Sequence, residues 1–262
     1  MIDVLGLARP PRWGLVMMVA LVLVNGALLT YLVLRPAPSD PFAGRASAPV
    51  AQTSNVTVPP DSATASSAPT TPEAPPILAV IGDGYSTGSA LGGQGATGWP
   101  ALVAEQLGAE LRLHAVSMAG YAAPGMTGQD FADIATASPV PDADVTVVFG
   151  SRNDLDQSVA AVARGASETL QLIRSSAPRT QLVVVGPAWS SSDVPVDLYP
   201  LRDAVQEAAQ AAGATFVDPL EAGWFDQPAT LIAQDGISPT DAGHALLATQ
   251  ISPHVQQKLS AG

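Results

Sequence analysis

The stretch Ile77-Leu-Ala-Val-Ile-Gly-Asp-Gly-Tyr-Ser-Thr-Gly88 decides the fold of this chain. Five apolar residues, several of them β-branched, run directly into glycines and an aspartate. This pattern predicts a buried strand that ends in a tight turn. In an open α/β sheet, ligands bind beyond the carboxyl ends of the strands. We therefore expect a binding site to begin at this turn, in the middle of which stands Gly84.

Strand and helix patterns alternate from this stretch to the C-terminus. The expected strands are 77–81, 110–116, 144–149, 181–185 and 214–217, and the expected helices are 101–107, 155–176, 198–212 and 240–259. The last helix is expected to be interrupted near Pro253. Short apolar strands that alternate with helices indicate one α/β/α domain over residues 77–262, with a parallel five-stranded sheet. The turns after the first three strands would bring Gly84, Gly120 and Asn153 to one edge of this sheet.

Charge and cysteine content exclude several classes of function. The net charge of -12 lies entirely in residues 77–262, because the first 76 residues carry four basic and four acidic side chains. An acidic domain repels phosphate backbones, so no nucleic-acid partner is expected. The chain has no cysteine, which excludes disulfides and a thiol nucleophile.

An uncharged apolar run precedes the domain. Residues 14–34 carry no charged side chain, and a helix of that length would cross about 30 Å of hydrocarbon. Trp13 and Tyr31 lie near its ends, where aromatic rings favour the membrane interface. We expect a short tail at 1–12, an uncleaved transmembrane signal anchor at 13–34, and a single-pass protein of the cell membrane whose C-terminal domain is extracytoplasmic. The alternative is a cleaved signal peptide with Ala46-Ser47-Ala48 as its cleavage site.

Residues 35–76 have the composition of a linker. They are rich in Pro, Ala, Ser and Thr and almost devoid of large apolar side chains. Such a segment cannot bury a core, so we expect it to be disordered or extended. It would hold the domain away from the membrane.

Four sequence blocks of the domain resemble those of the SGNH (GDSL-type) hydrolase family. The family's first block, Gly-Asp-Ser, reads here Gly82-Asp83-Gly84, and the glycine of its second block is matched by Gly120. Its third block, Gly-x-Asn-Asp, is matched by residues 151–154 with the glycine displaced to 150. Its last block, Asp-x-x-His, is matched by residues 235–238. The resemblance implies a flavodoxin-like three-layer fold and an esterase, lipase or carbohydrate deacetylase ancestry.

Two departures from the family pattern concern catalysis. The resemblance places the nucleophilic serine at Gly84 and the histidine base at Ser238, with Asp235 as the carboxylate that would orient the base. Glycine offers no nucleophile, and a serine hydroxyl cannot replace imidazole as a proton shuttle at neutral pH. The donors implied for the oxyanion hole, Gly84, Gly120 and Asn153, are retained. The sequence therefore predicts a pocket without an intact catalytic triad.

A second set of residues offers an alternative catalytic arrangement. Residues 84–88 spell Gly-x-Ser-x-Gly, the nucleophile elbow of α/β-hydrolases, with Ser86 as nucleophile and His244 as its base. The aspartates 83, 154 and 235 could suggest a metal site. The resemblance assigns them to loop and triad positions, so neither a metal nor a cofactor is expected.

The sequence favours a membrane-tethered, non-catalytic binding or accessory module. Its ligand would be a cell-envelope glycan, an acyl ester or a protein partner. The alternative is an active esterase, lipase or carbohydrate deacetylase that uses Ser86 with His244. A third possibility is a structural role in which the pocket is empty.

Overall fold

The computed structural model describes residues 74–150 and 152–261. The predicted tail, the membrane anchor at 13–34 and nearly all of the linker lie outside these residues. Within the described part of the chain, no helix combines the length and hydrophobicity needed to cross a bilayer.

Five parallel strands form the central sheet of the described domain, in the order β2-β1-β3-β4-β5. The strands are β1 (Ile77–Gly82), β2 (Glu110–Ala115), β3 (Val145–Phe149), β4 (Gln181–Val185) and β5 (Thr215–Val217). The strand order switches direction after β1, since β2 lies on one side of it and β3 on the other. This switch point is where a doubly wound sheet opens a crevice for a ligand. The predicted five-stranded parallel sheet is confirmed.

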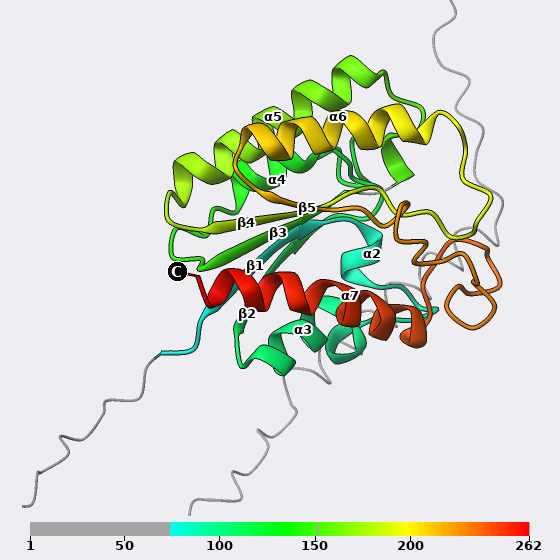
Figure 1. Cartoon of the computed structure of the whole chain (residues 1–262), viewed down its shortest axis with the longest axis horizontal. Coiled ribbons are helices and arrows are strands. Elements are labelled where there is room, and N and C mark those ends of the chain that lie inside the picture. Colours follow the sequence, from blue (N-terminus) through cyan, green and yellow to red (C-terminus); the bar gives the residue numbers. More distant parts are fainter. Residues whose placement is uncertain (1–73, 151, 262) are drawn as a thin grey trace, which may run out of the picture. The chain divides into compact units, whose positions relative to one another are not determined.

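Helices cover both faces of the sheet (Figure 1). One face carries α4 (Phe131–Ala137), α5 (Val159–Ser176) and α6 (Leu198–Ala211), and the other carries α3 (Trp99–Leu107) and α7 (Asp241–Leu259). The core is divided in the same way, because successive strand residues point to opposite faces. In β3, Val147 belongs to the cluster under α3 and α7, whereas Val148 belongs to the cluster under α4, α5 and α6.

Three predictions about helices were incomplete or wrong. A one-turn helix α2 (Gly84–Thr87) follows β1 directly, where a loop was expected, and Asp83 caps it by accepting from the Tyr85 N–H. Helix α4 was not predicted, although its start carries a capping box between Asp130 and Asp133. Helix α7 runs through Pro253 without a break, and packing of its buried apolar side chains against α3 and the sheet outweighs the missing hydrogen bond. Two 3₁₀ turns, η1 (Gly95–Thr97) and η2 (Arg152–Asp154), complete the described elements.

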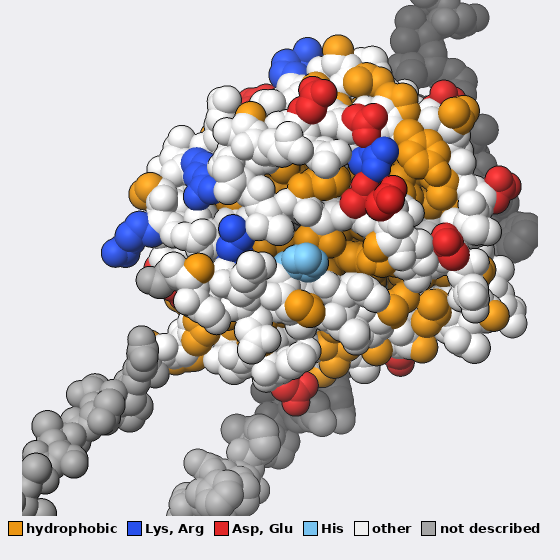
Figure 2. Space-filling model, in the orientation of Figure 1, with side chains coloured by type: hydrophobic (Ala, Val, Ile, Leu, Met, Phe, Trp, Pro, Cys, Tyr) orange, Lys and Arg blue, Asp and Glu red, His pale blue; other side chains and the backbone are white. Residues whose placement is uncertain are grey.

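The face shown in Figure 2 is a mixed surface. Exposed hydrophobic side chains form small groups, and acidic and basic side chains are scattered among uncharged ones. No single basic surface covers this face.

Candidate functional site

A cavity of about 170 Å³ opens at the carboxyl edge of the sheet. It lies at the switch point, because its walls come from the segments that follow β1, β2 and β3, together with the turn before α7. The lining includes Asp83, Gly84, Tyr85, Ser117, Met118, Arg152, Asn153, Ile237, Ser238 and His244. The structure thus brings together Gly84, Asn153, Ser238 and His244 among the predicted site residues, while Gly120, Asp235 and Ser86 are not part of the wall.

Gly84 stands at the turn from strand to helix. It is the first residue of α2 and follows the capping residue Asp83. A Cβ atom built on Gly84 would meet only the Ser117 Oγ, at 3.6 Å, and the Gly84 φ lies outside the left-handed region. A serine therefore fits at this position in both space and backbone conformation.

Asn153 is tied into the wall of the cavity by both hydrogens of its amide. Its Nδ2 donates to Asp83 Oδ2 at 2.6 Å and to the carbonyl oxygen of Ala119 at 2.8 Å. The other oxygen of the buried Asp83 accepts the Tyr85 N–H at 3.0 Å. An oxyanion role for Asn153 would require one of these two bonds to be exchanged for a ligand oxygen.

Gly120 shapes the loop after β2 rather than facing the cavity. Its N–H donates to the Ala123 carbonyl. A Cβ on Gly120 would lie 2.4 Å from Oδ1 of the buried Asp154, so a side chain is excluded here. Asp154 in turn accepts the N–H groups of Tyr121, Ala122 and Ala123, each at 2.9 Å. Burial raises the pKa of the Asp154 carboxyl in spite of these three hydrogen bonds.

The turn before α7 retains Asp235, which matches the carboxylate of the family's triad. Ser238 donates its hydroxyl to Asp235 Oδ2 at 2.6 Å, and the Ile237 and Ser238 N–H groups donate to Oδ1 at 2.9 Å. The Ser238 hydroxyl, followed by these N–H groups, lowers the pKa of Asp235. The carboxylate is therefore charged at neutral pH, and it holds a hydroxyl rather than an imidazole.

Tyr85 joins the two loops that carry Gly84 and Ser238. The phenol, on α2, donates to the carbonyl oxygen of Ile237 at 2.6 Å. Its ring packs against Phe149 and, edge to face, against Phe225. The spacing between the strand–helix turn and the Asp235 turn is thus fixed by a buried side chain that the sequence did not single out.

The alternative pair, Ser86 and His244, lacks the contact that nucleophilic catalysis needs. Both side chains are buried, and neither Ser86 Oγ nor His244 Nε2 has a hydrogen-bond partner among the described residues. Ser86 lies inside α2, where a Cβ on Gly82 would come within 2.3 Å of its Oγ, and a Cβ on Gly93 would come within 2.0 Å of His244 Nε2. His244 Nδ1 accepts the Trp99 N–H at 3.3 Å, so its proton resides on Nε2. An esterase base would have to accept the proton of the serine, and this geometry provides no such bond.

Protonation of His244 is expected to destabilise the domain. Burial is the main cause that lowers its pKa to about 4, from 6.5, against the opposing attraction of Asp241. Because the folded state holds the imidazole neutral, this contribution to stability is complete above pH 6.5 and is lost as the pH falls toward 4. We expect wild type to lose about 3 kcal/mol more than His244→Asn over this range, measured by urea unfolding at several pH values.

The control for this experiment is His254→Asn, since His254 is only half-buried and sits on the same helix. Asparagine at 244 keeps an acceptor near the position of Nδ1 for the Trp99 N–H. Equal losses of stability in wild type and His244→Asn would contradict the buried, neutral imidazole.

Sequence reasoning missed the polar and apolar residues that complete the cavity wall. Arg152 stands in the variable position of the third block, and its guanidinium carbon lies 4.1 Å from the centre of the Trp189 ring. Met118 has a left-handed backbone, with φ of 65°, and its side chain is 63% exposed at the cavity. The signal that could have identified these two residues was their position beside motif residues. A motif marks a loop, and the other residues of that loop also face the site.

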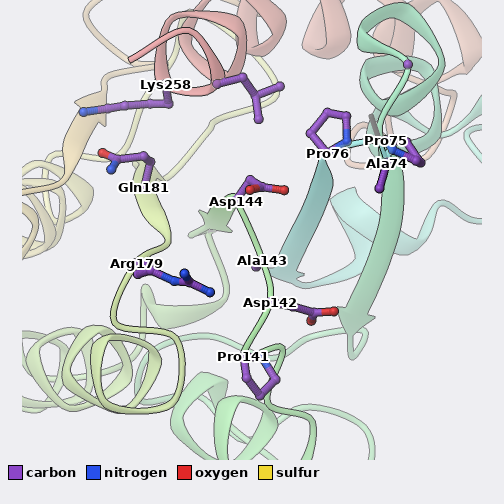
Figure 3. Close-up of a pocket in the computed structure, with 12 residues that line it drawn as sticks. Ala74, Pro75, Pro76, Pro141, Asp142, Ala143, Asp144, Arg179, Gln181 and Lys258 are labelled. Carbon is purple, nitrogen blue, oxygen red and sulfur yellow. The ribbon is translucent and has the colours of Figure 1, made fainter. Parts of the chain in front are cut away.

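A larger cavity, of about 890 Å³, lies at the opposite edge of the sheet (Figure 3). Its wall combines residues that precede or begin β1, β3 and β4, such as Pro76, Asp144 and Gln181, with the end of α7 at Lys258. Asp144 is engaged in accepting the Ile77 N–H at 2.7 Å. Because ligands of open α/β sheets bind at the carboxyl ends of strands, we assign the candidate site to the smaller cavity.

Among the described residues, no three His, Asp or Glu side chains are arranged to hold a metal ion.

The fold and the cavity at its switch point define a three-layer α/β protein with a candidate ligand site at the carboxyl edge of its sheet. The sequence profile of the GDSL-like lipase/acylhydrolase family matches residues 80–246. A GDSL lipase of Mycobacterium tuberculosis is 39% identical over 190 residues, which cover 70% of this chain and 82% of that protein. The chain belongs to the GDSL-like lipase/acylhydrolase (SGNH) family.

Solved structures share the fold at lower sequence identity. A carbohydrate esterase family 2 enzyme of Corynascus thermopiles (Myceliophthora fergusii) superposes with a TM-score of 0.60 at 21% identity, over 74% of this chain and 69% of that chain. The lipase/acylhydrolase of Enterococcus faecalis gives a TM-score of 0.56 at 16% identity, over 70% of this chain and 96% of that chain. The family match and the Mycobacterium tuberculosis relative confirm the predicted resemblance to the SGNH family, and the solved structures support the fold.

Proposed function

We propose that this protein is a non-hydrolytic member of its family that binds an ester or acylated sugar of the cell envelope. The observation that carries the proposal is the composition of the cavity. The strand–helix turn presents Gly84 where the family has its nucleophile, and Asp235 holds the Ser238 hydroxyl where the family has its imidazole. The cavity itself persists, with the two loops joined by Tyr85.

The ligand class follows from the relatives and from the wall of the cavity. The Mycobacterium tuberculosis relative is a lipase by name, and structural neighbours include carbohydrate esterases. The cavity has a polar floor, formed by Asp83 and Asn153, and an apolar rim, formed by Met118 and Ile237. Such a wall suits a ligand in which a carbonyl or hydroxyl oxygen lies next to a small apolar group. The predicted span at 13–34 would tether this domain to the outer side of the cell membrane, where such ligands occur.

The absence of hydrolysis is the first part of the test. We expect the purified full-length chain to show no turnover of 4-nitrophenyl acetate above the buffer rate and no labelling by a fluorophosphonate probe. The reason is that neither Gly84 nor the buried Ser86 supplies an activated hydroxyl. Labelling at Ser86, or turnover that disappears in Ser86→Ala, would overturn the proposal and favour the active esterase.

Ligand binding is the second part of the test. An acetylated cello-oligosaccharide is expected to bind saturably, and Gly84→Val is expected to abolish binding because its branched side chain would fill the space beside Ser117. Ala211→Val serves as the control, since Ala211 is exposed at the end of α6 and does not line the cavity. Binding that survives Gly84→Val would place the ligand elsewhere and contradict the proposed site.

A further inference from the structure

Arg152 brings an unmatched positive charge to the cavity wall. It starts the 3₁₀ turn η2, directly before Asn153. Among the described residues, ion pairs within 4.0 Å are formed by Arg112 and Arg202 and none by Arg152. The neighbouring acidic groups of the site, Asp83 and Asp235, are instead engaged by N–H and O–H donors.

The guanidinium of Arg152 is oriented by its contact with Trp189. The guanidinium carbon lies over the indole ring, 4.1 Å from the ring centre. An arginine held in this way keeps its donors in the plane at its edge, where they match the two oxygens of a planar anion. Bidentate arginine–carboxylate pairs combine charge with a fixed direction.

The charges around Arg152 favour a monoanion over a dianion. Asp83 lines the same cavity and is buried, and the domain carries the whole net charge of -12. A phosphate dianion would meet more repulsion from these carboxylates than a carboxylate of charge -1 would. The arrangement is therefore suited to a carboxylate.

We propose that the ligand of this cavity carries a carboxylate in addition to its ester or acyl group, and that Arg152 binds this carboxylate. The inference rests on the proposed function, since it names the ligand class of the same site. The ester oxygen would lie toward Gly84 and Asn153, and the carboxylate would lie at the edge of the guanidinium that Trp189 supports.

Two esters of one acid test this assignment. Monomethyl succinate carries one ester and one carboxylate, whereas dimethyl succinate has two esters and no charge. We expect the full-length chain to bind the monoester about tenfold more tightly than the diester at pH 7 and moderate salt, measured by ligand-observed NMR titration. Arg152→Gln should abolish this preference, and Arg152→Lys should retain part of it.

The matched control is Arg164→Gln, which removes an exposed arginine of α5 and should leave the preference unchanged. Equal affinities for the two esters in wild type, or a preference that survives Arg152→Gln, would overturn the assignment. Tighter binding of methyl phosphate than of monomethyl succinate, lost in Arg152→Gln, would overturn the choice of a carboxylate. Methanol released in the same titration would instead refute the proposed lack of hydrolysis, so the two failures are distinguishable.

Discussion

Asp154→Ala is expected to lower the free energy of unfolding by about 3 kcal/mol. The Asp154 carboxylate is buried and accepts the N–H groups of Tyr121, Ala122 and Ala123. Alanine would leave these three donors without their acceptor and open a void behind Gly120. The gain from removing a desolvated carboxyl, whose pKa burial already raises, offsets only part of this loss.

Asp154→Asn separates the hydrogen bonds from the volume of the side chain. Its amide oxygen can replace Oδ1, which serves Ala122 and Ala123, but its NH₂ group would face the Tyr121 N–H. We expect a loss of about 1–2 kcal/mol, and no change for the exposed control Asp156→Ala. Urea unfolding of the three variants checks the order. An Asp154→Ala protein as stable as wild type would contradict the role of this carboxylate in holding the loop.

The sheet was predictable because β1, β3 and β4 are mostly apolar runs, while apolar and polar residues alternate in β2. The observed β4 (Gln181–Val185) agrees with the prediction at both ends, and each of the other predicted strands differs by one residue at one end. Buried parallel strands are apolar on both faces, so they stand out from their surroundings without any knowledge of tertiary contacts. The predicted break in the last helix was based on its proline alone. The packing of its apolar side chains, which keeps the helix continuous, could not be read from local sequence.

The site was predictable at the level of loops, and less so at the level of individual donors. Gly84, Asn153 and Ser238 line one cavity. The ends of the predicted strands brought Gly84 and Asn153 to the same edge of the sheet, and the family resemblance placed Ser238 at the same site. The Gly120 N–H, however, is taken by the Ala123 carbonyl, and Asn153 is held by Asp83 and Ala119. The direction of an N–H bond depends on loop conformation, which block spacing does not encode. The roles of these residues toward a ligand remain predictions.

The second large effect is a gain of activity in Gly84→Ser/Ser238→His. Serine at 84 would stand at the start of α2 with space around its Cβ. Histidine at 238 would replace the hydroxyl that now bonds to Asp235, and that charged carboxylate could accept an imidazole N–H. Tyr85 already fixes the distance between the two loops through Ile237. The variant therefore supplies the two missing groups within a frame that is otherwise in place.

The size of the gain follows from how triad members act together. Removal of one member costs about as much as removal of several, so each single variant should remain at the buffer rate. We expect the double variant to exceed either single variant by on the order of 10²-fold, less than a complete family enzyme. The deficit arises because the Gly120 N–H and the Asn153 amide are engaged with protein acceptors. Adding Asp235→Asn to the double variant should reduce the rate again.

Hydrolysis of 4-nitrophenyl acetate by wild type, the two single variants and the double variant tests the central claim most directly. The claim is that this cavity is a family site made inactive by Gly84 and Ser238. It predicts turnover, and fluorophosphonate labelling at position 84, in the double variant alone. Turnover by wild type, or a correctly folded double variant that remains at the buffer rate, would contradict it.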